Sequence, residues 1–439
     1  MKTILTFIAI AALLVASACA QMSSGAAYPS SQQVNAIYPD IEKLYIDLHR
    51  NPELAFHEQR TAAALAERAK VLGFEVTTGV GGTGIVAILK NGHGPTVMLR
   101  TELDALPIEE KTGLPFASTV TTKNAAGDTV PVAHACGHDL HMSAWVGTAE
   151  LMVQDRQNWR GTLMLVGQPA EEIVSGAAAM LKDGLFTRFP KPDYALSLHD
   201  EPMLPSGVVG FHPGYFRASA DTVEITIFGR GGHGAAPHMT VDPVVIAARV
   251  ILGLQTIVSR ENNPMDPAVI TVGSIHGGMV ANIIPEQVKL QLTMRTFNPE
   301  ARKRMLAAIE REVKGEAIAA NAPKEPTIEV KSGTDAVYND PQLTQRMAGV
   351  LRTALGPKNV VEMSAEMTSE DFSQYGLAGA HAVLLHIGAV DPAKMEAARQ
   401  SGTMLPKLHS PQWAPDREPT IKAAITAETA ILLDLFRNQ

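Results

Sequence analysis

The stretch GTLMLVGQPAEE, residues 161–172, runs from an apolar segment into two adjacent acids. Its short apolar run between glycines predicts a buried strand over 161–167. A helix at 176–182 and a second apolar strand at 194–199 follow it. This strand–helix–strand order is typical of a parallel sheet that carries helices on both of its faces. We therefore expect an α/β fold in which ligands gather beyond the carboxyl ends of the strands.

The same alternation of helices and strands extends to both sides of this unit. Apolar spacing predicts further helices at 39–50, 58–72, 140–153, 341–355 and 419–436, and strands at 84–89, 96–103 and 382–387. These elements lengthen the parallel sheet and supply helices for its two faces.

Between Arg217 and Lys331 the pattern changes. The elements predicted there are strands at 222–228, 268–275, 287–297 and 327–330, and helices at 242–259 and 299–320. In chain order they read βαββαβ, which is a ferredoxin-like module. We therefore expect this module, residues 217–331, to be inserted into a larger domain formed by 36–216 and 332–439.

The N-terminal residues 1–20 have the features of a secretory signal. Their apolar run, 4–15, is too short to span a bilayer, and the run ACA at 18–20 fits the small-x-small pattern before a cleavage site. We expect cleavage after that run and export to the periplasm or the medium, with 21–35 as a flexible polar leader. A lipid anchor on Cys19 is the alternative, but the leucine that usually stands three positions upstream is missing.

The composition is that of a globular protein, with 439 residues, 46% of them hydrophobic and 19% charged. A chain of this length exceeds one ordinary core, which favours two domains. The net charge of −8 and the lack of basic runs argue against a nucleic-acid partner. Beyond the N-terminal segment, no apolar run is expected to cross a membrane.

The run AHACGHDLH, residues 133–141, carries the chemistry. Removal of the N-terminal segment leaves Cys136 as a single thiol, which then has no internal disulfide partner. A soft thiolate two residues from His138, with a carboxylate close by, is what a divalent metal site needs. Asp139 and His141 are well placed to orient or supplement the ligands.

Glu171 and Glu172 follow a predicted buried strand, and adjacent side chains at a strand end point in different directions. One glutamate can therefore bind metal while the other faces a metal-bound water, whose pKa the metal lowers from about 16 to roughly 7. The second carboxylate can take the proton of that water and pass it to a leaving amine. His199, at the end of the next strand, is a further candidate ligand, and Asp104 is a candidate supporting carboxylate.

Several ordered motifs together carry a family resemblance. They are LHRNPEL (48–54), LRTELDALP (99–107), the 133–141 run, the acid pair at 171–172, GGHGAAPH (231–238), NIIP (282–285), SEDF (369–372) and LHS (408–410). From Asp47 to Ala430 the chain resembles the metallo-amidohydrolases of the aminoacylase and carboxypeptidase G superfamily. Within it, the chain is most similar to the subgroup of hippurate hydrolase and the indole-acetyl-amino-acid hydrolases.

The resemblance implies two divalent metal ions per subunit, held by Cys136, His138, Glu172, His199 and His409. It casts Glu171 as the general base and acid. Cys136 stands where many relatives have a bridging aspartate. A thiolate favours zinc, while carboxylate-rich relatives accept manganese, cobalt or nickel, so zinc and manganese are the leading candidates.

The insert resembles the lid and dimerisation domain of that family, which implies a homodimer. By the same likeness, His233 reaches the reaction centre and stabilises the tetrahedral oxyanion, either within one chain or across a dimer. Asn282 and Arg295 resemble the pair that holds the substrate carboxylate, a task that suits an arginine fork. His386 is an extra histidine near the pocket, either a packing residue or a substrate contact.

The expected activity is thus a metal-dependent hydrolysis of the amide bond in an N-acyl amino acid or a related small conjugate. Two alternatives stay open. One is a carboxypeptidase or dipeptidase that uses the same site on short peptides. The other is a non-catalytic periplasmic binding protein for amino-acid conjugates. Because binding alone needs no proton shuttle, Glu171 beside Glu172 argues against the second.

Overall fold

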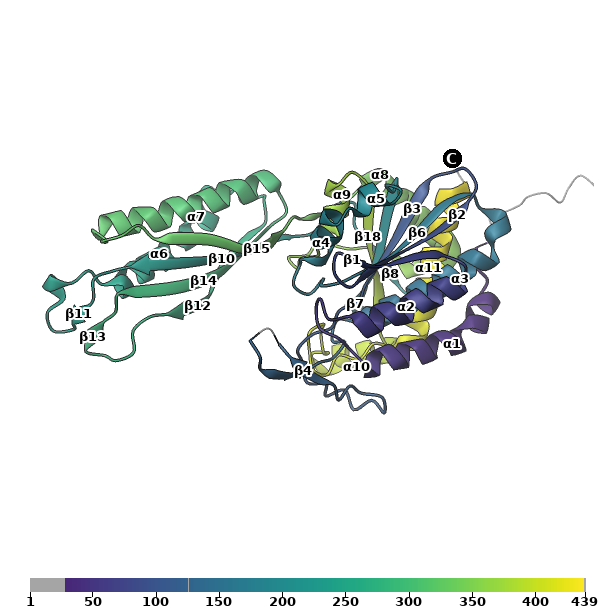
Figure 1. Ribbon diagram of the computed structural model, residues 1–439, viewed down its shortest axis with the longest axis horizontal. Helices are drawn as coiled ribbons and strands as arrows, with labels where there is room; N and C mark the ends of the chain where they lie inside the picture. The colour runs from purple at the N-terminus through teal and green to yellow at the C-terminus, as the bar shows by residue number, and fades with distance from the viewer. Residues whose placement is uncertain (1–27, 125, 438–439) are drawn as a thin grey trace, which may run out of the picture.

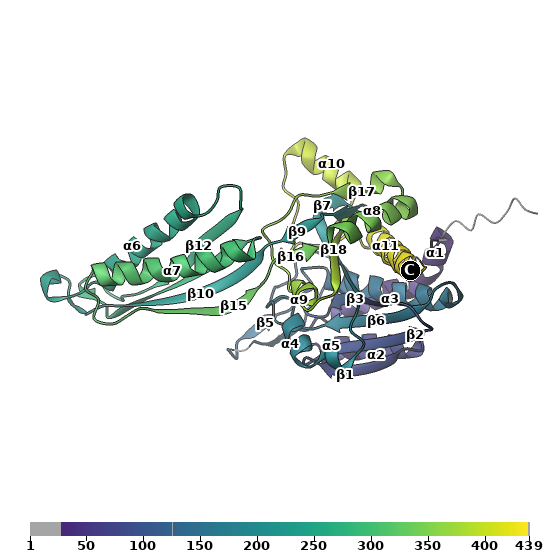
Figure 2. The ribbon, with the colours of Figure 1, turned by 90° about the horizontal axis from the view of Figure 1, so that it is seen from above.

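The computed structural model describes residues 28–124 and 126–437. The expected signal segment, and Cys19 with it, lies outside the described residues. Figure 1 shows a larger α/β body and a slimmer arm that extends from one side of it, and Figure 2 shows the same division from above. The expected α/β fold with an inserted ferredoxin-like module is confirmed.

The body is built on an eight-stranded sheet. In spatial order its strands are β1 (Glu75–Val80), β2 (Gly84–Asn91), β6 (Gly161–Gln168), β3 (Thr96–Glu102), β7 (Tyr194–Pro205), β18 (His381–Val390), β8 (Val209–Phe211) and β17 (Val360–Glu362). The central strands β6, β3, β7 and β18 run parallel, whereas β1 and β2 form an antiparallel edge. The carboxyl ends of the central strands therefore lie together, as the site requires.

Helices cover both faces of this sheet. One face carries α1 (Ser31–Arg50), α2 (Gln59–Val71), α3 (His138–Gln154), α8 (Pro341–Leu355) and α11 (Arg417–Arg437), which share the largest buried apolar cluster. The other face carries α4 (Gly176–Lys182), α5 (Leu185–Arg188) and α9 (Ser373–Leu377), with a second cluster. Strands β3 and β6 are buried almost throughout because the sheet is covered on both sides.

Helix α1 begins at Ser31, upstream of the start expected at Pro39, so residues 31–35 of the expected leader are helical. Ser30 and Gln33 form a capping box that satisfies the first backbone amides. Pro39 lies inside α1, and a proline in a helix interior removes a backbone hydrogen bond. Here the packing of α1 against α3 and α11 outweighs that loss.

The arm is the inserted module. Its elements are β10 (Ser219–Phe228), α6 (Pro243–Thr256), β12 (Ala268–His276), β14 (Gln287–Thr296), α7 (Pro299–Ala319) and β15 (Thr327–Thr334). The strands form an antiparallel sheet in the order β12–β14–β10–β15 and share one buried core with the two helices. This is the ferredoxin-like order, and the last strand continues beyond the joint expected at Lys331.

One stretch of the described residues, Pro243–Glu261, has the length and apolar composition of a membrane span, which the sequence argument did not expect. It comprises α6 and the turn of π-helix that follows. Ile246 and Val250 are buried in the arm core, whereas Val245 and Leu252 are exposed. A helix that lies on a sheet buries one face in this way.

Several short strands went unpredicted because two to four residues are too few to show a period. They are the hairpin β4 (Thr121–Lys123) with β5 (Thr129–Pro131), the pair β11 (Gly232–His233) with β13 (Ile283–Ile284) and the pair β9 (Gly214–Arg217) with β16 (Val337–Asn339). The helix α10 (Pro392–Ser401) also went unpredicted. Figure 1 shows β11 and β13 at the far tip of the arm.

Candidate active site

Cys136 and His138 lie where the chain turns into α3. Gly137 between them is the N-cap, with a left-handed φ of 71°, and a Cβ there would come within 2.4 Å of the Asp200 carboxylate. The turn therefore requires glycine, because any other residue would meet both backbone strain and a clash. Cys136 and His138, which flank Gly137, are both buried.

Glu171 and Glu172 lie in the loop after β6, and two buried carboxylates hold that loop. Asp104 accepts hydrogen bonds from the backbone amides of both glutamates, each at 3.0 Å. Glu58 accepts from the amide of Ala170 at 2.9 Å, and Ala170 has a positive φ of 53°. Such strained backbone persists only where its surroundings fix it, and it is found at functional sites. Asp104 thus positions the glutamate pair through the backbone.

His199 and His409 approach from two other segments. His199 lies within β7 and is buried. His409 belongs to the segment between α10 and α11 and has a positive φ of 64°. Its amide donates to the carbonyl of Ala135 at 2.7 Å, which ties this distant segment to the run that carries Cys136.

The predicted ligands converge on Cys136. Its sulfur lies 3.6 Å from His199 Nε2 and 3.3 Å from His409 Nε2. His409 Nε2 is 3.3 Å from Glu172 Oε2, and His138 Nε2 is 4.0 Å from Glu172 Oε1. Two sets of three ligand atoms result, each within 4.8 Å: Cys136 with His138 and His199, and Cys136 with Glu172 and His409. Cys136 is common to both, as a ligand between two cations would be.

The outer ring nitrogens of the buried histidines are anchored to the backbone. His138 Nδ1 donates to the carbonyl of Asp104 and His199 Nδ1 to that of Asp200, both at 2.8 Å. This fixes the tautomer that turns the Nε2 lone pair inward, the usual arrangement of metal-binding histidines. His138 Nε2 and Glu172 Oε1 are buried without a hydrogen-bond partner among the described residues. Unpaired buried acceptors of this kind fit divalent cations.

The ionisation of these groups suits metal binding and proton transfer. Burial lowers the pKa of His138 to about 3 and the pKa of His199 well below its usual value, so both imidazoles are neutral. Burial raises the pKa of the Cys136 thiol, an effect that a bound cation reverses. Burial also raises the pKa of Glu171. A carboxyl with a raised pKa can accept a proton and return it.

Asp139 and His141 lie behind the ligands. Asp139 Oδ2 is 2.6 Å from His49 Nδ1. His141 Nδ1 donates to Glu102 at 3.0 Å, and its Nε2 accepts the amide of Asp200 at 2.8 Å. Sequence reasoning did not place His49 in the site, because it lies 90 positions from Asp139. The available signal was its place in the LHRNPEL motif.

The three predicted residues of the arm do not lie together. Arg295, half-buried on β14, lines the same pocket as the ligands. His233 and Asn282 are exposed at the β11–β13 strand pair at the tip of the arm (Figure 1), where the amide of Gly234 donates to the carbonyl of Asn282 at 2.8 Å. Within one chain, Asn282 is therefore a neighbour of His233. Within one chain, the tip lies away from the metal cluster.

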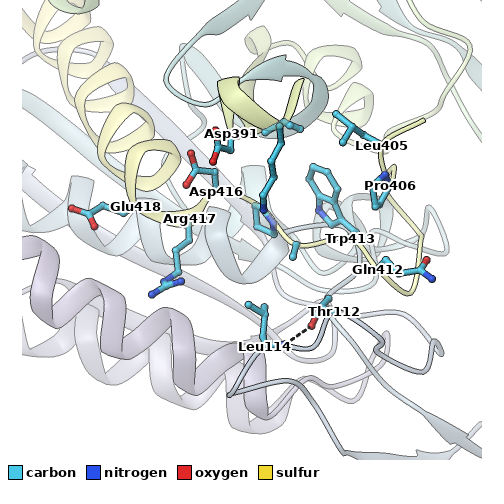
Figure 3. Close-up of a pocket in the computed structure, with 14 residues that line it drawn as sticks. Thr112, Leu114, Asp391, Leu405, Pro406, Gln412, Trp413, Asp416, Arg417 and Glu418 are labelled. Atoms are coloured by element: carbon cyan, nitrogen blue, oxygen red, sulfur yellow. Dashed lines mark hydrogen bonds between the residues drawn. The ribbon is translucent and has the colours of Figure 1, made fainter. Parts of the chain in front are cut away.

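The ligand cluster opens into a pocket of about 350 Å³ whose walls include Arg217 and Arg295. A second cavity, of about 450 Å³, is lined by residues on both sides of His409 in the sequence, Trp413 among them (Figure 3). Trp413 Nε1 donates to Asp200 at 3.2 Å, so this second cavity borders the residues that support the ligands. The ligating and proton-transferring groups themselves face the first pocket.

Known proteins resemble the chain in sequence. It matches the family model described as peptidase family M20/M25/M40 over residues 98–400. It is 36% identical to hippurate hydrolase of Campylobacter jejuni, over 76% of this chain and 84% of that protein. It is 34% identical to thermostable carboxypeptidase 2 of Saccharolobus solfataricus, over 75% of this chain and 80% of that protein. The chain belongs to the M20 peptidase family.

A solved structure of an M20 protein agrees with the fold described above. The YXEP protein of Bacillus subtilis, described as a dinuclear metal-binding peptidase, matches this M20 chain with a TM-score of 0.73 and 29% identity, over 91% of this chain and 98% of that chain. The resemblance found in the sequence motifs is confirmed. The M20 chain is a metal-dependent hydrolase of the amidohydrolase and peptidase type.

Proposed function

We propose that this M20 enzyme hydrolyses the amide bond of N-acyl amino acids or closely related conjugates, releasing a carboxylic acid and an amino acid. The observation that carries the proposal is the different placement of two adjacent acids. Glu172 joins a ligand set with Cys136 and His409, while Glu171 lies beside the cluster with its carboxylate 3.8 Å from His138 Nε2. A binding protein needs no such free acid, whereas amide hydrolysis does.

Different residues of the chain serve the different steps of amide hydrolysis. Two divalent cations, when bound, supply Lewis-acid chemistry that polarises the amide carbonyl and acidifies a water. Glu171 accepts the proton of the attacking water on its carboxylate and delivers it to the leaving amine nitrogen. Arg295 holds the carboxylate of the amino-acid part with its planar fork. His233 supports the developing oxyanion from a second subunit, and Asn282 beside it joins Arg295 in holding the substrate carboxylate.

We propose zinc or manganese as the native cation. A thiolate ligand favours zinc, while relatives richer in carboxylate ligands accept manganese. Metal analysis of the purified protein, followed by stripping and reconstitution with zinc, manganese, cobalt or nickel, tests this choice. Full activity of metal-free protein would contradict it.

A substrate panel tests the activity. Benzoyl-, acetyl- and indole-acetyl-amino acids are compared with free dipeptides, each with and without a chelator. We expect chelator-sensitive cleavage of at least one N-acyl amino acid and little cleavage of dipeptides. Because one relative is named a carboxypeptidase, dipeptide cleavage is the second candidate activity, and preferential cleavage of dipeptides would establish it instead. Tight binding of the panel without turnover by the metal-loaded protein would favour a binding protein.

We also propose a homodimer formed through the arm. β12 is an edge strand of the arm sheet, and α6 beside it exposes Val245 and Leu252. An edge strand next to exposed apolar side chains is suited to pair with a second copy. Sedimentation of wild type should give a dimer that Leu252→Glu dissociates. The control Leu377→Glu, exposed on the body, should remain dimeric, and a monomeric wild type would contradict the proposal.

Export to the periplasm or the medium is a further proposal, based on the signal-like residues 1–20. N-terminal sequencing of protein recovered from cell fractions should find Gln21 first, in the soluble exported fraction. A lipid-modified Cys19 in the membrane fraction would contradict this form of export and establish the anchored one.

A further inference from the structure

Arg217 is buried in the wall of the pocket that holds the ligand cluster. It ends β9 at the joint between the body and the arm, and 6% of its side chain is exposed. Nη1 donates to Thr368 Oγ1 at 2.6 Å, and Nη2 donates to His386 Nε2 at 2.8 Å.

The partners of Arg217 differ from those of Arg100, which is also buried. Arg100 donates to Glu370 at 2.8 Å and to Asp371 at 3.1 Å. Among the described residues, the carboxylate oxygen within 4.0 Å of the Arg217 guanidinium is Glu366 Oε2, at 3.8 Å, which is beyond hydrogen-bond distance. Buried charges are normally paired, because an unpaired one is costly. In the part of the chain that the structure describes, Arg217 is therefore a buried cation with a long ion pair to Glu366 and no carboxylate at hydrogen-bond distance.

The guanidinium also has donors to spare. Its two hydrogen bonds among the described residues use two of the five N–H groups of an arginine, and its Nε is buried without a partner. Because Nη2 donates to His386 Nε2, His386 carries its proton on Nδ1, 3.1 Å from Glu201 Oε2. A neutral imidazole thus separates Arg217 from the buried Glu201. The sequence left His386 open between packing and substrate contact, and the structure sets it against Arg217.

We propose that Arg217 receives a second carboxylate of the substrate, so that this M20 enzyme prefers N-acyl amino acids that carry two negative charges. The inference rests on the proposed function, in which Arg295 takes the carboxylate of the amino-acid part. Arg217 from the body and Arg295 from the arm line one pocket, so two anionic groups can be held at once. A guanidinium with free N–H groups recognises a carboxylate through charge-assisted hydrogen bonds.

The second carboxylate has two chemical sources. It belongs either to the side chain of an acidic amino acid or to the far end of a dicarboxylic acyl group. Two matched pairs of substrates distinguish them, because the members of each pair differ by one charge at nearly equal size. N-benzoylglutamate against N-benzoylglutamine tests the side chain, and N-succinylalanine against its succinamoyl analogue tests the acyl end.

We expect the metal-loaded wild type to show a kcat/KM about 10- to 100-fold higher for the charged member of at least one pair, the range of a hydrogen bond to a charged group. Arg217→Met should bring this ratio to within about threefold of unity, because it removes the group that distinguishes the two members of each pair. Arg346→Met is the matched control, because Arg346 lies on α8 and donates to Asp434, outside the pocket. It should keep the full preference.

Two further measurements distinguish a lost charge preference from a loss of fold or metal. Thermal unfolding and metal content show whether Arg217→Met is folded, and Arg217→Lys, which keeps the charge but loses the fork, should keep a reduced preference. Calorimetry of N-benzoylglutamate and N-benzoylglutamine, and of the succinyl pair, with the Glu171→Gln protein gives the binding ratio without turnover. The same charge preference in binding is expected there.

The outcomes are separable. Equal kcat/KM for both members of both pairs in wild type overturns the role of Arg217 and leaves the proposed function standing. An equal loss on charged and uncharged substrates in Arg217→Met also overturns it, because that result marks a structural contact. Failure of the metal-loaded enzyme to cleave any member contradicts the proposed function instead, and the calorimetric ratio then decides the role of Arg217.

Discussion

The metal cluster in the body and the tip of the arm are built in opposite ways. Cys136 and His138 are buried, and backbone hydrogen bonds fix the ring of His138 and the loop that carries Glu171. At the tip, His233 is exposed on the two-residue strand β11, and Asn282 is exposed just before its partner strand β13. The body therefore holds its reactive groups in place before substrate arrives, whereas the role proposed for the tip needs a second subunit. Variants of the two regions should therefore differ in whether their loss of activity depends on the assembly of subunits.

The largest effect is expected in the body. Glu171→Gln removes the group that accepts and returns the proton, so kcat/KM should fall by about 10³-fold. Because Glu171 lies outside the two ligand sets built on Cys136, metal content should stay near that of wild type. Steady-state kinetics with metal analysis measure both quantities. The exposed Glu362→Gln is the matched control and should keep full activity, and a Glu171→Gln enzyme of wild-type activity would rule out the role.

A smaller loss of activity is expected for a variant of the arm. His233→Ala removes a donor to the developing oxyanion, for which a loss of about 100-fold in kcat is typical. Its metal content and fold should be those of wild type, because His233 is exposed and lies away from the ligands. His93→Ala, an exposed histidine on the body, is the matched control and should keep full activity.

A mixing experiment turns this difference into a direct test. Glu171→Gln and His233→Ala subunits are each nearly inactive, but a mixed dimer contains one site with an intact body and an intact tip. Random exchange should therefore restore about a quarter of wild-type activity if the site is shared between subunits. Restoration is assayed after the subunits are mixed and allowed to exchange. No recovery, with exchange shown by a labelled subunit, would contradict the shared site.

A third change weakens the preorganisation of the body itself. Asp104→Asn leaves one oxygen for the amides of Glu171 and Glu172 and turns an NH₂ group toward the other amide. The lost hydrogen bond and the unsatisfied donor cost about 1–3 kcal/mol, and metal affinity should fall about 10-fold as the loop shifts. Competition with a chelator measures the affinity. The exposed Asp128→Asn should leave it unchanged, and so would Asp104→Asn if the carboxylate were not a positioning group.

The body was easier to predict from the sequence than the arm's contribution. Local patterning placed α4 and α8 with their observed bounds, because glycine, proline and apolar spacing mark these helices directly. Resemblance supplied the ligand set, and the structure brings Cys136, His138, Glu172, His199 and His409 together. Each of these residues belongs to a segment whose local pattern or motif is informative on its own.

The residues that sequence reasoning missed or separated act over long distances in the chain. His49 pairs with Asp139 across 90 positions, and no local period reports such a contact. Asn282 and Arg295 were expected to share the substrate carboxylate, and within one chain the β11–β13 pairing sets Asn282 beside His233. A two-residue strand pair leaves no periodic pattern from which this could be found. Arg217, taken as a joint, lies in the pocket wall only because β9 pairs with β16.

The smallest expected effect tests burial in the body away from the site. Glu428 on α11 accepts a hydrogen bond from Thr148 on α3 at 2.6 Å, and burial raises the pKa of Glu428 to about 8. Between pH 4.5 and 8 the unfolded chain therefore releases this proton while the folded chain keeps it. The folded state binds more protons in that range, so the free energy of unfolding falls as the pH rises.

Glu428→Gln removes this titration, so its free energy of unfolding should fall less steeply than that of wild type as the pH rises. Relative to wild type, its Tm should rise by about 1–3 °C between pH 5 and pH 8, since the larger the chain, the smaller the Tm shift per kcal/mol. Scanning calorimetry at both pH values measures the difference. The exposed Glu362→Gln should show the same offset from wild type at both. If the Tm of Glu428→Gln also showed the same offset from wild type at both pH values, the carboxyl of Glu428 would be as well solvated as an exposed one. Burial between the two helices would then not set its ionisation.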